Sequence, residues 1–176
     1  MNSALIIVEG LADKGFIEGI VEKLQVPCKV RIMRGNRPER ASRLLKALMG
    51  EFSKAIVLKD LRRAGRETTT LINKLASKIR QLESQGLQSQ VIIVKRSIES
   101  WILAGLSVNN PEEILNPEEE LKELMQKKGK HYVKSPEIYK RLAKEVDIKE
   151  AIAKSETFKN FIEILERVRR DPPHAA

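Results

Sequence analysis

Cysteine, histidine and aromatic residues are scarce in this chain of 176 residues. The single cysteine, Cys28, cannot form an intramolecular disulfide, and no Cys/His spacing typical of a zinc site occurs. The two histidines, His131 and His174, have no neighbouring cysteine, serine or second histidine that would suggest a nucleophile relay. The sequence therefore predicts a protein of a reducing compartment that folds without disulfides or a structural metal.

Long apolar runs are also missing. The first apolar run, 4–8, is interrupted by Glu9, which makes it too short for the apolar region of a signal peptide. No segment approaches the roughly 20 apolar residues that span a bilayer. We therefore expect a soluble, cytoplasmic protein with no membrane partner. The apolar fraction of 41% is sufficient for a buried core at this length.

Positive charge is concentrated in one part of the chain. The segment 29–66 holds twelve Lys and Arg residues against three acids, a surplus of nine that equals the net charge of the whole chain, +9. Such a segment favours phosphate-bearing partners, so we expect nucleic acid or a nucleotide as the ligand. The alternative is a solvated basic surface, as in many thermophilic proteins. Phe52 is the only aromatic residue of this segment, so base stacking has little to contribute.

Strand and helix patterns alternate through the first hundred residues. Four apolar or alternating runs indicate strands, and apolar residues at helical spacing follow each of them. The strands are expected at 4–8, 29–33, 55–58 and 91–94. The alternation predicts an α/β fold, a mostly parallel four-stranded Rossmann-like sheet with helices on both faces.

The pattern changes from Pro111 onward, where no strand-like run appears and prolines separate helical segments. We therefore expect a C-terminal α-helical extension. The expected organisation is an α/β domain over 1–106, a helical extension packed on it over 107–170, and a flexible tail over 171–176.

Three acids lie where a parallel sheet places functional groups, just past the carboxyl ends of its strands. Glu9 ends the first strand, Asp60 ends the third, and Glu99 follows the fourth. Clustered carboxylates repel one another unless they share a cation or proton, so the cluster indicates a Mg²⁺ or Mn²⁺ site. A second interpretation stays open: Glu9 with Asp13, and Glu99 behind Ser97, favour the N-terminus of the following helix.

Two short motifs resemble those of the Toprim family. Val8-Glu9-Gly10-Leu-Ala-Asp13 is similar to the first Toprim motif, and Asp60-Leu-Arg62-Arg63-Ala-Gly65 is similar to the second, Asp-x-Asp-x-x-Gly. Toprim domains serve primases, topoisomerases and nucleases. The resemblance implies a Toprim-like fold, Glu9 as the catalytic acid or base, and Asp60 as a metal ligand. Arg62 stands where the family has its second aspartate, and its charge would repel a cation.

Three later stretches resemble uncharacterised Toprim-like families of archaea and bacteria. The segment 92–103 is similar to their Glu-x-Trp helix, here with Glu99 and Trp101. Tyr132-Val-Lys134 and Ser155-Glu-Thr-Phe158-x-x-Phe161 resemble their later segments. Because those families have no well-established activity, this resemblance implies a fold more than a function.

These observations lead to three hypotheses. The first is a metal-dependent nuclease or other phosphodiester or phosphoryl enzyme, with Glu9 catalytic and Asp60 and Glu99 as ligands of Mg²⁺ or Mn²⁺. The second is a non-catalytic module that binds nucleic acid or a nucleotide, which Arg62 favours. The third is a structural or regulatory subunit in which the acids stabilise helix ends. In the first two, the residues expected to hold phosphate are Lys59, Arg62, Arg63, Arg66, Gly10 and Gly65.

Overall fold

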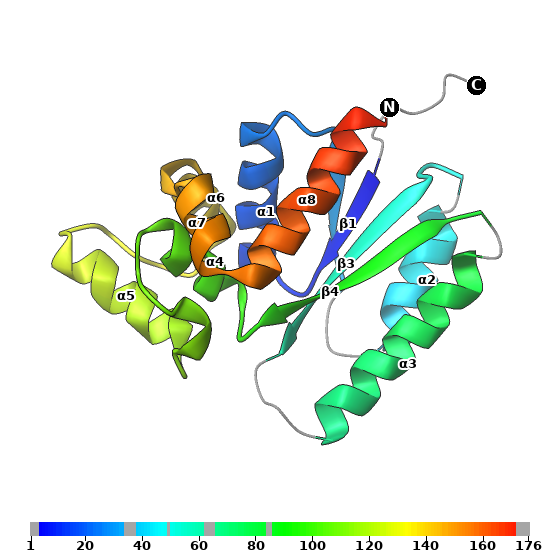
Figure 1. Cartoon of the computed structure of the whole chain (residues 1–176), viewed down its shortest axis with the longest axis horizontal. Coiled ribbons are helices and arrows are strands. Elements are labelled where there is room, and N and C mark those ends of the chain that lie inside the picture. The colour runs from blue at the N-terminus through cyan, green and yellow to red at the C-terminus, as the bar shows by residue number, and fades with distance from the viewer. Residues whose placement is uncertain (1–3, 34–37, 49, 62–65, 84–85, 172–176) are drawn as a thin grey trace.

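A computed structural model describes residues 4–33, 38–48, 50–61, 66–83 and 86–171. Strands and helices alternate over the first part of the chain (Figure 1). These elements are β1 (Ala4–Val8), α1 (Leu11–Lys23), β2 (Cys28–Ile32), α2 (Pro38–Leu48), β3 (Lys54–Leu61), α3 (Arg66–Glu83), β4 (Gln88–Lys95) and α4 (Ile98–Gly105).

The four strands form one sheet in the order β2-β1-β3-β4, and all its pairs are parallel. This confirms the predicted α/β fold with a four-stranded parallel sheet. β3 and β4 are longer than expected, because β3 continues to Leu61 in register with β4. Lys59 pairs with Ile93 and Asp60 with Val94, so both residues lie within β3 and not in a loop after it.

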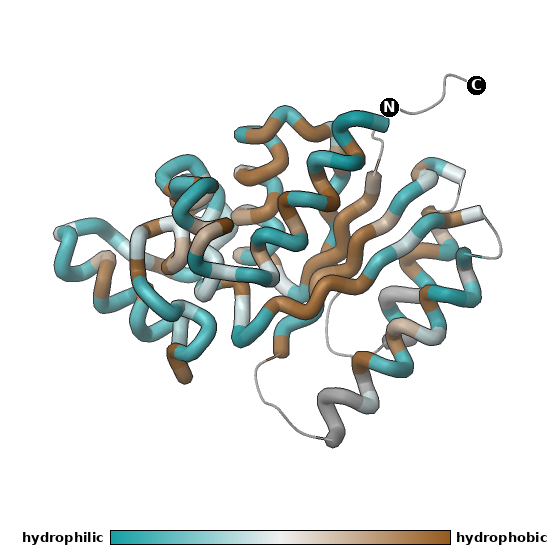
Figure 2. Tube along the Cα trace, in the orientation of Figure 1, coloured by the Kyte–Doolittle hydropathy of each residue, from teal (hydrophilic) through white to brown (hydrophobic). Residues whose placement is uncertain are grey.

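Each face of the sheet has its own core, because successive residues of a strand point to opposite faces. In β1, Ile6 and Val8 belong to a core with α1, whereas Leu5 and Ile7 belong to a core with α2 and α3. All five residues of β1 are buried, as expected of a central strand covered on both faces. Figure 2 shows this continuous hydrophobic centre of the sheet.

Beyond α4 the described chain, 106–171, contains helices and no strand, as the sequence predicts. The elements are a short 3₁₀ helix (Pro111–Glu113), α5 (Pro117–Lys127), α6 (Pro136–Glu145), α7 (Ile148–Lys154) and α8 (Glu156–Arg170). α6 packs against α1, α7 against α4, and α8 against β4 (Figure 1). The extension therefore completes the core on the α1 side of the sheet. No helix among the described residues is long and apolar enough to cross a membrane.

α1 and α6 approach each other closely because two glycines face the contact. A Cβ atom on Gly15 would collide with the main chain of Pro136, and one on Gly19 would lie 2.6 Å from the Cβ of Ala143. At the other end of this contact, Lys23 Nζ donates to main-chain carbonyls at the end of α6, including that of Lys144 at 3.0 Å. This packing positions the segment before α6, which contributes to the candidate site.

Candidate functional site

The three predicted acids lie at the carboxyl edge of the sheet. Glu9 directly follows β1, Asp60 is in the next-to-last residue pair between β3 and β4, and Glu99 is in the first turn of α4 after β4. Because every strand pair is parallel, these positions share one edge. Their side chains nevertheless have different surroundings.

Glu9 forms an ion pair with Lys59. Extending the register of β1 and β3, in which Ile7 pairs with Val57, places Glu9 level with Lys59 and on the same face. The Lys59 ammonium contacts Glu9 Oε1, and the two side chains are only 8% and 12% exposed. The first-motif carboxylate is thus neutralised by a lysine of the same chain, and Lys59 is engaged by an acid.

Asp60 lies on the opposite face of β3 from Lys59, the face to which Ile56 and Leu58 contribute core residues. It is 7% exposed, and Asp13 in the first turn of α1 is 8% exposed. A Cβ on Gly10 would lie 3.5 Å from Asp13 Oδ2, an ordinary contact, so Gly10 is not required there by crowding. Two buried carboxyl groups therefore belong to the α1 side of this edge.

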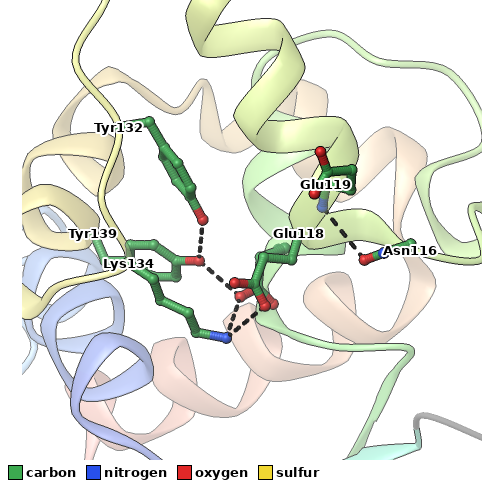
Figure 3. Close-up of polar contacts among 7 residues, drawn as sticks. Asn116, Glu118, Glu119, Tyr132, Lys134 and Tyr139 are labelled. Atoms are coloured by element: carbon green, nitrogen blue, oxygen red, sulfur yellow. Dashed lines mark hydrogen bonds and ion pairs between the residues drawn. The ribbon is translucent and has the colours of Figure 1, made fainter.

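Glu99 is buried at 2% exposure and is surrounded by donors from the helical extension. Lys134 Nζ lies 2.9 Å from Glu99 Oε1, and the Tyr139 hydroxyl donates to the same oxygen at 2.7 Å. The Tyr132 hydroxyl lies 2.9 Å from that of Tyr139 and donates to it, because the Tyr139 proton is directed at Glu99. Lys134 Nζ also lies 3.1 Å from Glu118 Oε2. Figure 3 shows how Lys134, Tyr139 and Tyr132 gather here.

These contacts fix the protonation states of the cluster. Burial would raise the pKa of Glu99, but the hydrogen bond with Ser97, the charge of Lys134 and the hydrogen bond from Tyr139 together lower it below its usual value. Burial and the neighbouring Glu99 charge raise the pKa of Tyr139. Burial opposes the charge of Lys134, but Glu99 outweighs it and raises the lysine pKa. At neutral pH the cluster holds an ionised Glu99, a charged Lys134 and neutral tyrosines.

A pocket of about 130 Å³ opens beside Glu99 and Lys134. Its lining contains two positively charged side chains, Arg96 and Lys134, and two acidic ones, Glu99 and Glu118. Arg96 has a left-handed backbone conformation, with φ of 72°, and its Nε donates to the main-chain oxygen of Glu112 at 3.3 Å. The other lining residues are Ser97, Leu115, Asn116 and Pro117.

The segments that resemble the uncharacterised Toprim-like families meet around α4. Glu99 binds Lys134, and Trp101 Nε1 donates to Thr157 Oγ1 at 2.9 Å. The Trp101 ring stacks on Phe161, with ring centres 5.2 Å apart, and meets Phe158 edge-on. The Glu-x-Trp pair is therefore a structural centre that joins the sheet domain to the extension, and the Glu99 carboxylate is committed to that junction.

Several residues expected to hold phosphate fall outside the described part of the chain. Arg62, Arg63 and Gly65 lie outside the described residues, and Arg66 is described only as the first residue of α3. Lys59 is described and pairs with Glu9. Gly10 is the N-cap residue of α1.

The carboxylates at this edge are engaged by lysines of the same chain. Among the described residues, which include all of Glu9, Asp13, Asp60 and Glu99, no group of three or more acids, histidines or cysteines is placed to hold a metal ion. Glu9 is paired with Lys59, and Glu99 with Lys134. The expectation that Glu99 completes a cation site with Glu9 and Asp60 stays a prediction, and Glu99 would have to leave Lys134 to take part in such a site.

Two helices that begin at this edge have N-termini without a side-chain cap. Gly10, which precedes α1, has no side chain to cap the helix, and the side chain of Ser97, which precedes α4, makes no capping hydrogen bond. In contrast, α5, α6, α7 and α8 are capped by the side chains of Asn116, Ser135, Asp147 and Ser155. Uncapped main-chain N–H groups and the helix dipole favour an anion.

Fold and site together define an α/β protein with a Rossmann-like parallel sheet and a charged, partly buried cluster at its carboxyl edge. Comparisons with family models, with curated proteins and with solved structures find no significant match to this chain. The Toprim-like relationship therefore stays a prediction that rests on the motifs themselves.

Proposed function

We propose that the protein binds phosphate groups of a nucleic acid or nucleotide at the carboxyl edge of its sheet, as a Toprim-like module that needs no resident metal for binding. The observation that carries this proposal is the buried ion pair between Glu9 and Lys59. An acid already neutralised by lysine does not require a cation, and it does not repel an incoming phosphate as a free carboxylate would.

Two further features support an anionic ligand at this edge. The N-termini of α1 and α4 are uncapped by side chains, and Arg96 lines the pocket that adjoins α4. The basic surplus of the segment 29–66 adds long-range attraction for a polyanion. Arg62 fits the same interpretation, because an arginine in place of a metal-binding aspartate improves an anion site.

A Mg²⁺- or Mn²⁺-dependent nuclease is the second candidate. The buried Asp13 and Asp60 favour it, since two carboxyl groups at the edge of a parallel sheet are suitable ligands for a hard cation. Recruitment of Glu9 to such a site would require Lys59 to release it, and recruitment of Glu99 would require Lys134 to release it.

The test is binding of fluorescent single-stranded and double-stranded oligonucleotides, first in EDTA and then in Mn²⁺, with the strand length checked after each measurement. Arg96→Gln is the edge variant, and Arg141→Gln, on the exposed side of α6, is its matched control. Binding in EDTA that weakens in Arg96→Gln but not in Arg141→Gln supports the binding module.

Two other outcomes contradict that proposal. Strand cleavage that appears with Mn²⁺ and disappears in Asp60→Asn replaces the binding module with the nuclease. No binding of any oligonucleotide or nucleotide at low salt rejects both candidates and leaves the positive charge as a solvated surface.

A further inference from the structure

The two borders of the sheet differ in their chemistry. β2 is a strand of five residues that carries Lys29 and Arg31, whereas β4 has eight residues and no charge before Lys95. Short, charged edge strands prevent pairing with a strand from another molecule. β4 lacks this protection over most of its length, and it lies at the border of the sheet with α8 on one face and α3 on the other (Figure 1).

The main-chain groups of β4 alternate between β3 and the open border. Gln88 N–H donates to the oxygen of Ser53, and Arg96 N–H donates to that of Leu61, so the even-numbered residues face β3. The odd-numbered residues direct their N–H and C=O groups outward. These are Ser89, Val91, Ile93 and Lys95, and their outward groups have no main-chain partner among the residues that the structure describes.

Side chains at this border are also incompletely packed. Ile93 is half-buried and belongs to neither hydrophobic core of the described chain, and Val91 packs only partly against the α3 side. The hydroxyl of Ser89 is buried and has no hydrogen-bond partner among the described residues. A cavity of about 470 Å³ adjoins this end of β4, between the strand and the end of α8.

We propose that a second copy of this chain pairs with β4 in antiparallel orientation, about a two-fold axis at Ile92, so that the two four-stranded sheets become continuous. This register sets Val91 opposite Ile93 of the partner subunit and Ser89 opposite Lys95 of the partner subunit. Every outward main-chain group from Ser89 to Lys95 then has a partner, because odd residues meet odd residues. The half-buried side chains of Val91 and Ile93 then pack against each other across the two subunits.

The positions of Glu83 and Lys95 favour a second copy over an unrelated peptide. Near the amino end of β4, Asp171 is paired with Lys54 at 3.0 Å, and the other charged residues lining the cavity are Glu83 and Arg167. The carboxyl end of β4 carries Lys95 and Arg96. Antiparallel pairing brings Lys95 at the end of one strand towards Glu83, beside the amino end of the other, twice per dimer. The partner's chain also covers the cavity next to α8 from the side of the strand.

The first test is the mass of the full chain in solution, by sedimentation equilibrium from nanomolar to high micromolar concentration. Ile93→Pro removes an outward N–H group without removing a bond to β3. Ile32→Pro is the matched control: Met33 N–H donates to Val8, so the Ile32 N–H faces the other border. Circular dichroism shows that each variant is folded.

We expect a dimer whose dissociation constant rises at least about tenfold in Ile93→Pro, since symmetry introduces each change twice, and does not change in Ile32→Pro.

Lys95→Glu and Glu83→Lys provide a second test that leaves the strand intact. Each alone weakens the dimer, and the double variant restores it. Three results overturn the proposal. The chain stays monomeric at every concentration, or Ile93→Pro leaves the dissociation constant of the dimer unchanged, or the double charge variant dimerises no more tightly than the single variants.

Discussion

The buried Glu99 is the residue on which the junction between sheet and extension depends. Its carboxylate accepts from Tyr139 and pairs with Lys134, and these contacts hold its pKa below the ordinary value despite burial. A buried carboxylate deprived of its cation costs much more than a surface ion pair contributes. Lys134 is about one-third exposed, so water moderates that cost.

We expect Glu99→Gln to lower the free energy of unfolding by about 2 kcal/mol at neutral pH. Because the folded-state pKa of Glu99 is depressed, its contribution is present above the ordinary value of 4.5 and is lost as the pH falls through the folded-state value. Stability should therefore fall less steeply with acid in Glu99→Gln than in the wild type. Urea unfolding across this pH range measures both effects.

Glu118→Gln is the control for that experiment. Glu118 also contacts Lys134, but its side chain is 48% exposed, so we expect a change within about 0.5 kcal/mol. An equal loss of stability in both variants would mean that the charge of Lys134, and not the burial of Glu99, governs this junction.

Metal affinity is the second residue-scale property that separates the two candidate functions. Lys59 is paired with the Glu9 carboxylate, and Arg62 stands where the Toprim motif that this segment resembles has a metal-binding aspartate. We expect Lys59→Met and Arg62→Asp each to tighten Mn²⁺ binding by about tenfold or more, because each removes a positive charge that competes with the cation. Isothermal titration with Mn²⁺ gives the affinities. Unchanged affinity in both variants would place no cation at this edge.

At the scale of elements, the contact between α1 and α6 determines where the extension lies. Gly15 and Gly19 are one turn apart on α1, and both face α6. Gly15 lies against the main chain of its first residue, Pro136, and Gly19 lies against the Cβ of Ala143. Such close approach leaves no room for even one methyl group. The helices cannot separate freely, because Lys23 also bonds the carbonyls at the end of α6.

Gly15→Ala should therefore destabilise the protein by about 2 kcal/mol or more, although alanine is the better helix former by about 1 kcal/mol. The Cβ atom meets the Pro136 main chain, which has no rotamer with which to move aside. Glu18→Ala, on the same helix, is expected to change stability by about 0.5 kcal/mol at most. Thermal unfolding of both variants is the measurement. A neutral or stabilising Gly15→Ala would show that α6 is free to shift.

The order of strands and helices is predictable from the sequence because each strand is a short apolar run followed by helical spacing. The limits of β3 are not, since Lys59 and Asp60 are polar yet continue the pairing with β4. The ion pair of Glu9 with Lys59 follows from the pairing of Ile7 with Val57, which sets Glu9 level with Lys59. The sequence alone does not give this register. Nothing local to Glu99 indicates Lys134 or Tyr139, because these partners come from the tertiary packing of the extension.

At the scale of the whole molecule, the uneven charge has a consequence that can be measured. The segment 29–66 carries the entire net charge of +9, and the rest of the chain is balanced. A ligand attracted by this segment must bind less tightly as salt increases, because binding to phosphates releases counterions. A ligand attracted by the pocket beside Arg96 alone would depend on salt much less.

We expect the variant Arg62→Gln, Arg63→Gln, Arg66→Gln to reduce the salt dependence of nucleic-acid binding by up to about 0.7–0.9 log units for each phosphate that the protein no longer neutralises. The matched control is the triple variant Lys128→Gln, Lys149→Gln, Lys159→Gln, which removes the same charge from exposed positions of the extension. Anisotropy titrations over a series of salt concentrations give the slope for each protein. If the two variants change the slope equally, the ligand responds to net charge alone. A smaller slope only in the arginine variant assigns phosphate binding to the arginines that follow β3 in the sequence.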